Sequence, residues 1–338
     1  MKTLKIVSFG NSNSGKTNYL SCALRFITKK YRKKLQLLGN DTFFQNFIGD
    51  ATKNLPNGKW VNKTPSRNIF DFKIKKIRND SNTSLSLWEN ILMVLIIILA
   101  IVFFPITIIW LLCCDDDEKN VTIHDWMGDA FEAMDYETST ASRGVSIGGD
   151  MCIPQNLFAK WKEMKLEPSL LHEFVNDINT ADCFMIFIDS AVLFSPDAKS
   201  LISRRLAGFT ELLRMRKELP GFDIVVSKAD QLEGIAAFSM KRAGKTMLEL
   251  DKIEKELREE FDFFFNYLEW MHCDKCTISL VSCVPKPDHR RVDPERGVIP
   301  NEKWTLDDLE VENAFSSVKR RQTNQLYPFS WILHNFLN

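Results

Sequence analysis

Residues 4–17 read LKIVSFGNSNSGKT, and the rest of the fold is inferred outward from this stretch. The apolar run at 4–9 predicts a buried strand, and residues 17–34 predict a helix. Between them, residues 10–17 match G-x-x-x-x-G-K-[ST], a loop whose backbone N–H groups hold phosphates at a helix N-terminus. In such a loop Lys16 reaches the β- and γ-phosphates, and Thr17 binds Mg²⁺. The sequence therefore predicts a nucleotide site with the binding residues Gly10, Asn13, Ser14, Gly15, Lys16, Thr17 and Asn18.

Strand and helix patterns alternate along most of the remaining chain. This alternation is typical of an α/β fold with a mostly parallel sheet covered on both faces. Together with the phosphate loop, it predicts the three-layer α/β/α architecture of P-loop NTPases. The further predicted strands are residues 69–77, 121–125, 183–189, 222–227 and 277–283, and the predicted helices are 169–179, 197–217, 247–271, 304–321 and 328–337.

A hydrophobic segment interrupts the alternation. Residues 91–112 form 22 successive positions without a charge, broken only by Pro105 and Thr107. Since about 20 apolar residues match the roughly 30 Å hydrocarbon layer of a membrane, membrane insertion is the first interpretation. A buried core helix is the alternative. Trp88 and Trp110 stand where interfacial aromatic side chains are expected.

Two further motifs stand at the ends of predicted strands. Asp125-Trp126-Met127-Gly128 matches D-x-x-G, and Ser227-Lys228-Ala229-Asp230 follows the strand at 222–227. In this order after a phosphate loop, the motifs resemble those of the P-loop GTPases of the Ras-like, translation-factor-related class, in which [NT]-K-x-D reads guanine. The resemblance covers residues 1–285 apart from the hydrophobic insert. More loosely, the chain resembles the bacterial double-GTPase group.

The resemblance implies a guanine-reading loop. Asp230 would accept two hydrogen bonds from the guanine N1 and N2 groups, which adenine cannot supply. Ser227 and Lys228 would complete this loop, although Ser227 replaces the usual Asn or Thr. Ser282 and Cys283, at the end of the last predicted strand, resemble the loop that meets the guanine carbonyl. The implied ligands are GTP and GDP.

The resemblance also implies a magnesium site with Thr17, Thr64 and Asp125 as ligands. Thr64 would be the threonine that closes over Mg²⁺ and the γ-phosphate, with Thr52 as the competing candidate and an ordinary loop threonine as the plain alternative. The catalytic residues implied are Lys16, Gly128, whose N–H would meet the γ-phosphate, and Asp129.

Hydrolysis is expected to be slow. Relatives place Gln, Glu or His after D-x-x-G to orient the attacking water, whereas this chain has the shorter Asp129. Because phosphoryl transfer depends mainly on positioning and charge stabilisation, Asp129 predicts slow turnover or a residue supplied by a partner. Arg143 is a candidate internal arginine finger, and a solvated loop arginine is the alternative.

The hydrophobic insert lies between the second and third strands of the expected domain. A single crossing would place Lys16 and Asp125 on opposite sides of the membrane and prevent the site from forming. We therefore expect a helical hairpin that bends near Pro105 and returns to the cytoplasmic face. The expected organisation is a discontinuous GTPase-like domain at 1–80 and 119–338, a membrane-inserting hairpin at 85–114, and a long polar loop at 285–303.

Composition narrows the class of protein. The chain has 338 residues with 44 Lys and Arg, 44 Asp and Glu and 45% apolar residues, which excludes a disordered or collagen-like chain. Residues 1–80 carry 17 Lys and Arg against 4 Asp and Glu, a bias that suits an anionic lipid surface. Nucleic-acid binding is not expected, because no recognisable module interleaves aromatic residues with these charges.

Eight cysteines in a chain without an apolar signal core indicate free thiols. Zinc binding at Cys273-x-x-Cys276 is a minor alternative.

The leading functional hypothesis is a membrane-associated GTP-binding switch that acts with a protein effector or regulator. An ATP-using P-loop enzyme and a scaffold that binds but does not hydrolyse nucleotide are the alternatives. The order of the three motifs favours the switch.

Overall fold

The structure is a computed structural model, and it describes residues 3–30, 35–37, 46, 49, 64, 66–76, 118–136, 144–146, 152–216, 218–232, 235–242, 245–282, 290–293, 297–300, 329 and 332. The hydrophobic segment 85–114, Thr52, Arg143 and Cys283 lie outside these residues. Within the part of the chain that is described, no helix is both long and apolar enough to span a bilayer.

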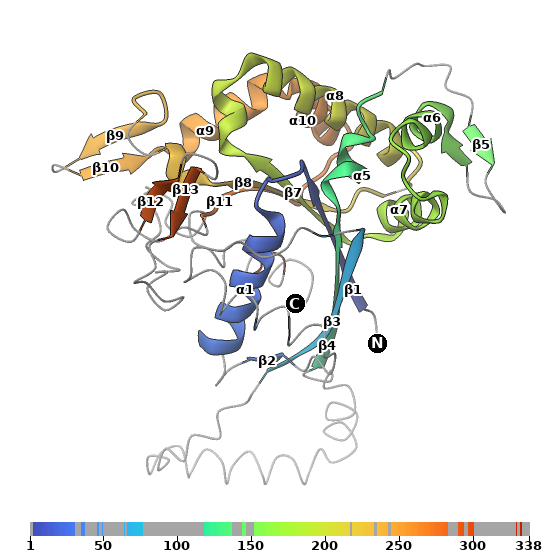
Figure 1. Cartoon of the computed structure of the whole chain (residues 1–338), viewed down its shortest axis with the longest axis horizontal. Helices are drawn as coiled ribbons and strands as arrows, with labels where there is room; N and C mark the ends of the chain where they lie inside the picture. The colour runs from blue at the N-terminus through green and yellow to red at the C-terminus, as the bar shows by residue number, and fades with distance from the viewer. Residues whose placement is uncertain are drawn as a thin grey trace, which may run out of the picture.

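A seven-stranded sheet organises the domain (Figure 1), in the order β11-β8-β7-β1-β4-β3-β2. Its strands are β1 (Thr3–Gly10), β2 (Leu35–Leu37), β3 (Arg67–Lys76), β4 (Glu118–Trp126), β7 (Cys183–Asp189), β8 (Gly221–Ser227) and β11 (Cys276–Leu280). Neighbours among β11, β8, β7, β1 and β4 pair parallel, whereas β3 pairs antiparallel with β4 and with β2. The predicted α/β fold with a mostly parallel sheet is therefore confirmed.

Helices pack against both faces of this sheet. On one face lies α1 (Lys16–Lys30), where Tyr19 contacts Phe187 of β7 and stacks on Phe329. The helices on the opposite face include α5 (Gly128–Glu132), α7 (Pro168–Thr180), α8 (Pro196–Leu213) and α10 (Asp262–Trp270). Side chains alternate between the two faces because successive residues of a strand point in opposite directions.

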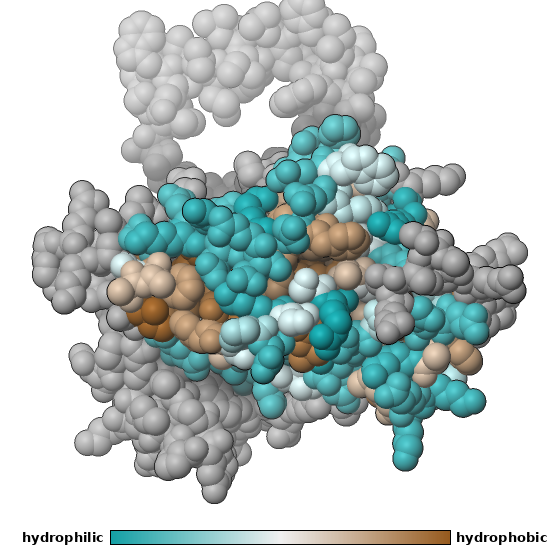
Figure 2. Space-filling model, turned by 90° about the horizontal axis from the view of Figure 1, so that it is seen from above, coloured by the Kyte–Doolittle hydropathy of each residue, from teal (hydrophilic) through white to brown (hydrophobic). Residues whose placement is uncertain are grey.

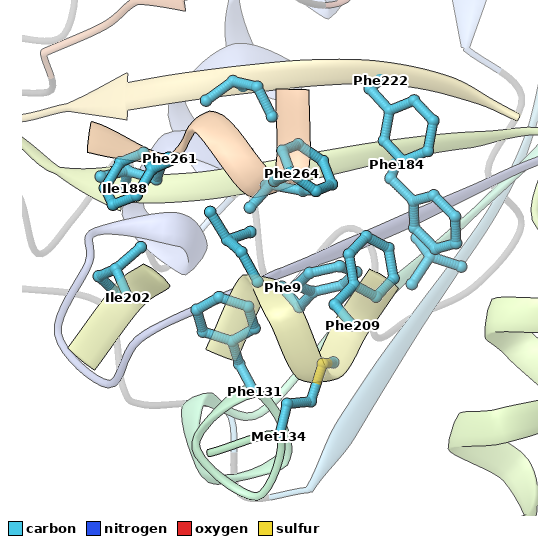
Figure 3. Packing of buried hydrophobic residues seen from close by; sticks show 14 of the residues in the cluster. Phe9, Phe131, Met134, Phe184, Ile188, Ile202, Phe209, Phe222, Phe261 and Phe264 are labelled. Carbon is cyan, nitrogen blue, oxygen red and sulfur yellow. The ribbon is translucent and has the colours of Figure 1, made fainter. Parts of the chain in front are cut away.

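Aromatic side chains fill the interface between the sheet and the second group of helices (Figure 3). Phe9 of β1 lies 4.8 Å from Phe209 of α8 between ring centroids, and Phe222 of β8 lies 5.9 Å from Phe264 of α10. Phe184 of β7 also contacts Phe209, at 5.1 Å. These rings are buried, so they pack β1, β7 and β8 closely against α8 and α10.

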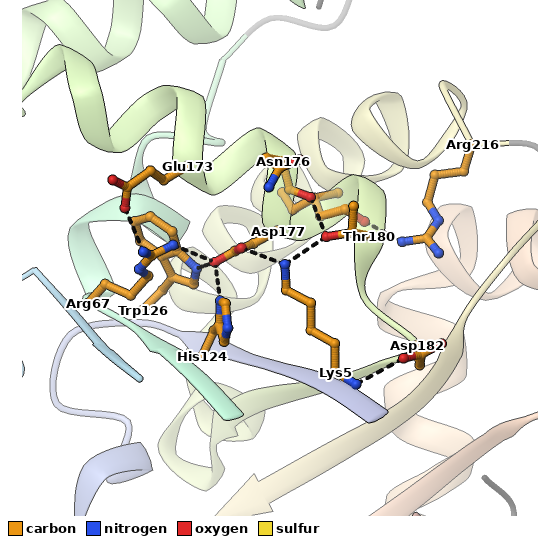
Figure 4. A network of polar contacts seen from close by, with 11 residues as sticks. Lys5, Arg67, His124, Trp126, Glu173, Asn176, Asp177, Thr180, Asp182 and Arg216 are labelled. Atoms are coloured by element: carbon orange, nitrogen blue, oxygen red, sulfur yellow. Dashed lines mark hydrogen bonds and ion pairs between the residues drawn. The ribbon is translucent and has the colours of Figure 1, made fainter. Parts of the chain in front are cut away.

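A buried carboxylate ties α7 to three strands (Figure 4). Asp177 accepts hydrogen bonds from His124 Nδ1 at 2.7 Å and Trp126 Nε1 at 2.9 Å, both on β4. It also pairs with Lys5 Nζ of β1 at 2.8 Å and Arg67 Nη1 of β3 at 3.1 Å. Burial raises the pKa of Asp177, but hydrogen bonds from His124 and Lys5 outweigh burial and hold it at about 2. The ionised carboxylate of Asp177 therefore holds α7 against the sheet, and these contacts are here called the clamp.

Some elements differ from the sequence-based predictions. The helix predicted over 247–271 is wrong at its start and in its middle: residues 247–248 belong to β10 (Lys245–Leu248), and α9 (Leu250–Glu260) ends at Phe261 before α10 begins. Phe261 leaves the helical conformation, with φ −116°, and its side chain is buried. The apolar periodicity continues across this break, which explains why one long helix was expected.

Several short elements were not predicted. Besides β2 and α5, they include α6 (Gln155–Glu163), the paired strands β5 (Gly144–Ser146) and β6 (Cys152–Pro154), and β9 (Ser239–Arg242), which pairs with β10. The segment expected to be a polar loop at 285–303 contains the antiparallel strands β12 (Arg290–Asp293) and β13 (Gly297–Pro300). Of the two closing helices predicted, only Phe329 and Ile332 are described, and both are helical and buried.

The face that carries α8, α9 and α10 is mainly hydrophilic, with smaller apolar patches between the polar side chains (Figure 2). Among the described residues, the exposed large hydrophobic side chains are Phe194, Met215, Phe263 and Trp270.

Candidate functional site

The loop at residues 10–17, here called the glycine loop, connects the end of β1 to the start of α1. A Cβ on Gly10 would overlap the backbone of Phe187, so only glycine fits there. Gly15 and Asn13 have φ values of 81° and 64°, in the left-handed region that glycine and asparagine adopt at low cost. Ser14 N–H donates to the Asn11 carbonyl at 3.1 Å. The chain therefore wraps into a compact loop at a helix N-terminus, an arrangement suited to binding an anion.

Three predicted metal ligands meet below the glycine loop. Thr64 Oγ1 donates to Asp125 Oδ2 at 2.8 Å and lies 3.0 Å from Thr17 Oγ1, while Thr17 Oγ1 lies 3.4 Å from the same carboxylate oxygen. Ser8 Oγ donates to the other oxygen, Asp125 Oδ1, at 2.8 Å. Both Thr64 and Asp125 are buried. Hydroxyl and carboxylate oxygens are the ligands that Mg²⁺ prefers, so the donor set fits that ion.

Lys16 contributes the positive charge of this cluster. It is 6% exposed, at the first position of α1. Burial raises the pKa of Asp125, and the charge on Lys16 together with the hydroxyls of Thr64, Ser8 and Thr17 acts in the opposite direction. A cation held at these oxygens would likewise favour the carboxylate form.

A second cluster lies at the ends of β7, β8 and β11. Ser282 Oγ donates to Asp230 Oδ1 at 2.6 Å, and Lys228 Nζ pairs with Asp189 Oδ2 at 2.5 Å. Lys228 has φ 53°, and its carbonyl accepts from Ser190 Oγ at 2.8 Å. Asp230 is 8% exposed. Lys228 and Asp230, which both follow β8, are thus held by Asp189 at the end of β7 and by Ser282 after β11.

The two clusters are joined by a direct contact. Ser227 Oγ donates to the carbonyl of Ser14 at 2.5 Å and also to Ile188 at 3.2 Å. Because β1 and β8 both run parallel to β7, their carboxyl ends meet at one edge of the sheet. The glycine loop and residues 227–230 therefore form one continuous polar edge, although they are far apart in the sequence.

Helix α5 lies directly on the glycine loop. Asp129 Oδ1 accepts from Ser12 Oγ at 3.0 Å, and Glu132 Oε1 accepts from Ser12 N–H at 3.2 Å. A Cβ on Gly128 would overlap the backbone of Ser12. Asp129, predicted to orient a water molecule, is thus bonded to the loop in this structure.

An arginine from α8 reaches the same loop. Arg205 Nη1 donates to Asn11 Oδ1 at 2.5 Å, and the side chain is buried. Sequence reasoning missed Arg205, Glu132 and Ser12. Glu132 could have been noticed, because it lies one helical turn after Asp129. No spacing signal marked Arg205, which comes from a distant helix.

Two further predictions concern Asn18 and zinc binding at Cys273 and Cys276. Asn18 lies in the first turn of α1, where its carbonyl accepts from Ser21 Oγ at 2.9 Å. At the minor zinc alternative, burial raises the pKa of Cys276 to about 12, which disfavours the thiolate that binds zinc. Among the described residues, no group of His, Cys, Asp and Glu side chains is arranged to hold a metal ion.

No family model and no curated protein matches this chain. The chain has distant structural similarity to the signal recognition particle receptor SRb-GTP/SRX complex from Chaetomium thermophilum, with 9% identity, a TM-score of 0.34, and coverage of 83% of this chain and 90% of that chain. A bacterial selenocysteine-specific elongation factor, EF-Sec, matches with 11% identity and a TM-score of 0.30, over 84% of this chain and 26% of its own. Both TM-scores are too low to support an argument about function, so the interpretation depends on the site itself.

Proposed function

We propose that the protein binds GTP and GDP with Mg²⁺ at this polar edge and hydrolyses GTP slowly. In this proposal the glycine loop holds the phosphates, and Thr17, Thr64 and Asp125 hold the metal ion. Mg²⁺ would supply charge stabilisation to the phosphates when bound. Asp230 reads the guanine, with Ser227, Lys228 and Ser282 placing it, and Lys16 and Gly128 meet the terminal phosphate.

The hydrogen bond between Ser227 Oγ and the Ser14 carbonyl is the observation that carries the proposal. Ser227 precedes Asp230 by three residues and Ser14 precedes Lys16 by two, so this contact supports a single nucleotide that spans both segments. Asp230 is held by Ser282 at 2.6 Å, so its carboxylate needs little rearrangement to accept from a base. Adenine lacks the paired N1–H and N2–H donors of guanine, so it cannot make both hydrogen bonds proposed for this carboxylate.

The proposal includes a membrane location on the cytoplasmic face. The paired residues Lys75 and Glu118 stand at the end of the β3–β4 pair opposite Arg67 and Trp126. Both ends of the segment that contains the hydrophobic residues therefore leave the sheet side by side, away from the polar edge. That placement favours a segment that enters and leaves one side of a bilayer over one that crosses it once. The positive charge of residues 1–80 suits anionic headgroups.

Nucleotide titration of the purified full-length protein tests the base-reading assignment. We expect binding of GTP and GDP in preference to ATP. Asp230→Asn should weaken GTP binding by at least about a hundredfold, because it removes two charge-assisted hydrogen bonds. The matched control is Asp274→Asn, an equal change of charge at an exposed position. An unchanged preference for GTP in Asp230→Asn would reject the assignment.

Two further measurements separate the parts of the proposal. Single-turnover phosphate release, compared with Lys16→Ala, distinguishes a slow GTPase from a protein that only binds nucleotide. Flotation with anionic liposomes, with and without residues 88–114, tests the membrane location. Equal flotation of both forms would reject the role given to the hydrophobic segment.

A further inference from the structure

Two carboxylates of α5 occupy donors of the glycine loop. Glu132 Oε1 accepts from the backbone N–H of Ser12 at 3.2 Å, and Asp129 Oδ1 accepts from its hydroxyl at 3.0 Å. The backbone N–H groups of such loops are the donors that hold phosphate. The Ser12 N–H, one of these donors, is therefore already bonded to a carboxylate of the protein, that of Glu132.

Close packing leaves α5 little freedom at this contact. Gly128 abuts the backbone of Ser12, because even one added carbon atom would overlap it. The position of α5 is further set by Tyr136, whose hydroxyl donates to the Gly208 carbonyl of α8 at 3.1 Å. A Cβ on Gly208 would overlap the carbonyl of Met134, so α8 and the segment after α5 also touch. This packing holds Asp129 and Glu132 of α5 beside Ser12.

The buried cation Arg205 lies close enough to Glu132 for their charges to interact. Arg205 is 7% exposed and donates from Nη1 to Asn11 at 2.5 Å. Its Nε is buried and has no hydrogen-bond partner among the described residues. Burial disfavours the charged form of Arg205 and lowers its pKa, whereas the charges of Glu132 and Asp135 favour it. The neighbourhood of residues 11 and 12 thus contains one arginine and two carboxylates before any phosphate is bound.

We propose that Glu132 and Asp129 make the site discriminate between a nucleoside diphosphate and a nucleoside triphosphate. This inference rests on the proposed function. The terminal phosphate enters between Lys16 and Gly128, next to Ser12, so its negative charge meets the two carboxylates and requires their release. A diphosphate ends before this point and leaves them in place. Binding of the triphosphate is therefore coupled to release of these two side chains from Ser12, and binding of the diphosphate is not.

Dissociation constants for GTP and GDP, measured on the full chain with Mg²⁺, test this inference. Glu132→Gln keeps the size of the side chain and an acceptor oxygen but removes the charge. We expect it to tighten GTP binding by about tenfold, the effect of one charge-assisted hydrogen bond, with GDP binding unchanged. Asp129→Asn should shift the ratio of the two constants in the same direction.

Asp135→Asn is the matched control. It removes the same charge three residues further along, at a carboxylate that accepts from Arg204 rather than from Ser12. The ratio of the two constants should stay at the wild-type value in this variant. An unchanged ratio in Glu132→Gln, or equal tightening for both nucleotides, would overturn the inference. Failure of the wild type to bind either nucleotide would instead reject the proposed function, and the inference with it.

Discussion

Replacing Asp177 with asparagine tests whether the ionised clamp stabilises the fold. The carboxylate is 1% exposed and receives donors from β1, β3 and β4, so the variant leaves buried and half-buried donors facing a neutral amide. Breaking a buried charge network by altering one partner costs about 3–5 kcal/mol. We expect the free energy of unfolding at pH 7 to fall by about 3 kcal/mol.

The pH dependence follows from the depressed pKa. The pKa of Asp177 is about 2 in the folded protein, below its ordinary value of 3.8. The carboxylate therefore stabilises the native state fully above the unfolded pKa and loses that effect as the pH falls toward 2. The pKa difference corresponds to roughly 2.5 kcal/mol, of which about 1 kcal/mol is lost at pH 3. The gap between wild type and Asp177→Asn should narrow by that amount between pH 7 and pH 3.

Urea unfolding of the full-length protein at the two pH values measures both effects. Glu173→Gln is the matched control, because Glu173 lies one turn earlier on α7 and pairs with Arg67 at 2.7 Å, but is 45% exposed. Exposed pairs contribute little, so this variant should lie within about 1 kcal/mol of wild type. A loss below about 1 kcal/mol in Asp177→Asn at pH 7, or a gap that does not narrow at pH 3, would refute the clamp.

Three other perturbations have defined outcomes. Burial raises the pKa of Asp223 from its ordinary value of 3.8 to about 7, so the free energy of unfolding should fall as the pH rises from about 4 to 7. Asp223→Asn should flatten this fall in urea titrations, and an unchanged slope would contradict the assignment. Because burial raises the pKa of Cys276 to about 12, its alkylation at pH 8, followed by mass spectrometry, should be at least about a hundredfold slower in the folded protein than in urea. Gly128→Ala should cost about 1–3 kcal/mol in thermal unfolding, since the methyl group meets Ser12, whereas Gly49→Ala meets open space and should be neutral.

The sequence by itself determined the central strand-loop-helix unit and the parallel strands that follow it. Local signals carry this information: an apolar run predicts a buried strand, and the spacing G-x-x-x-x-G-K-[ST] predicts the loop before α1. Asp125 and residues 227–230 were found from short motifs at the ends of predicted strands and from their order after that loop. Periodicity failed where it continued through a change of conformation, as at Phe261.

Only the tertiary structure decided which of these residues touch. Thr64 Oγ1 meets Asp125 across 61 residues of sequence, and Ser227 meets Ser14 across 213. Glu132 and Arg205 join the site because α5 and α8 pack over the glycine loop, and Asp177 acts as a clamp because three strands present donors to one helix. Such contacts depend on strand register and on how helices dock. A pattern confined to neighbouring residues cannot encode them, because its period describes one element at a time.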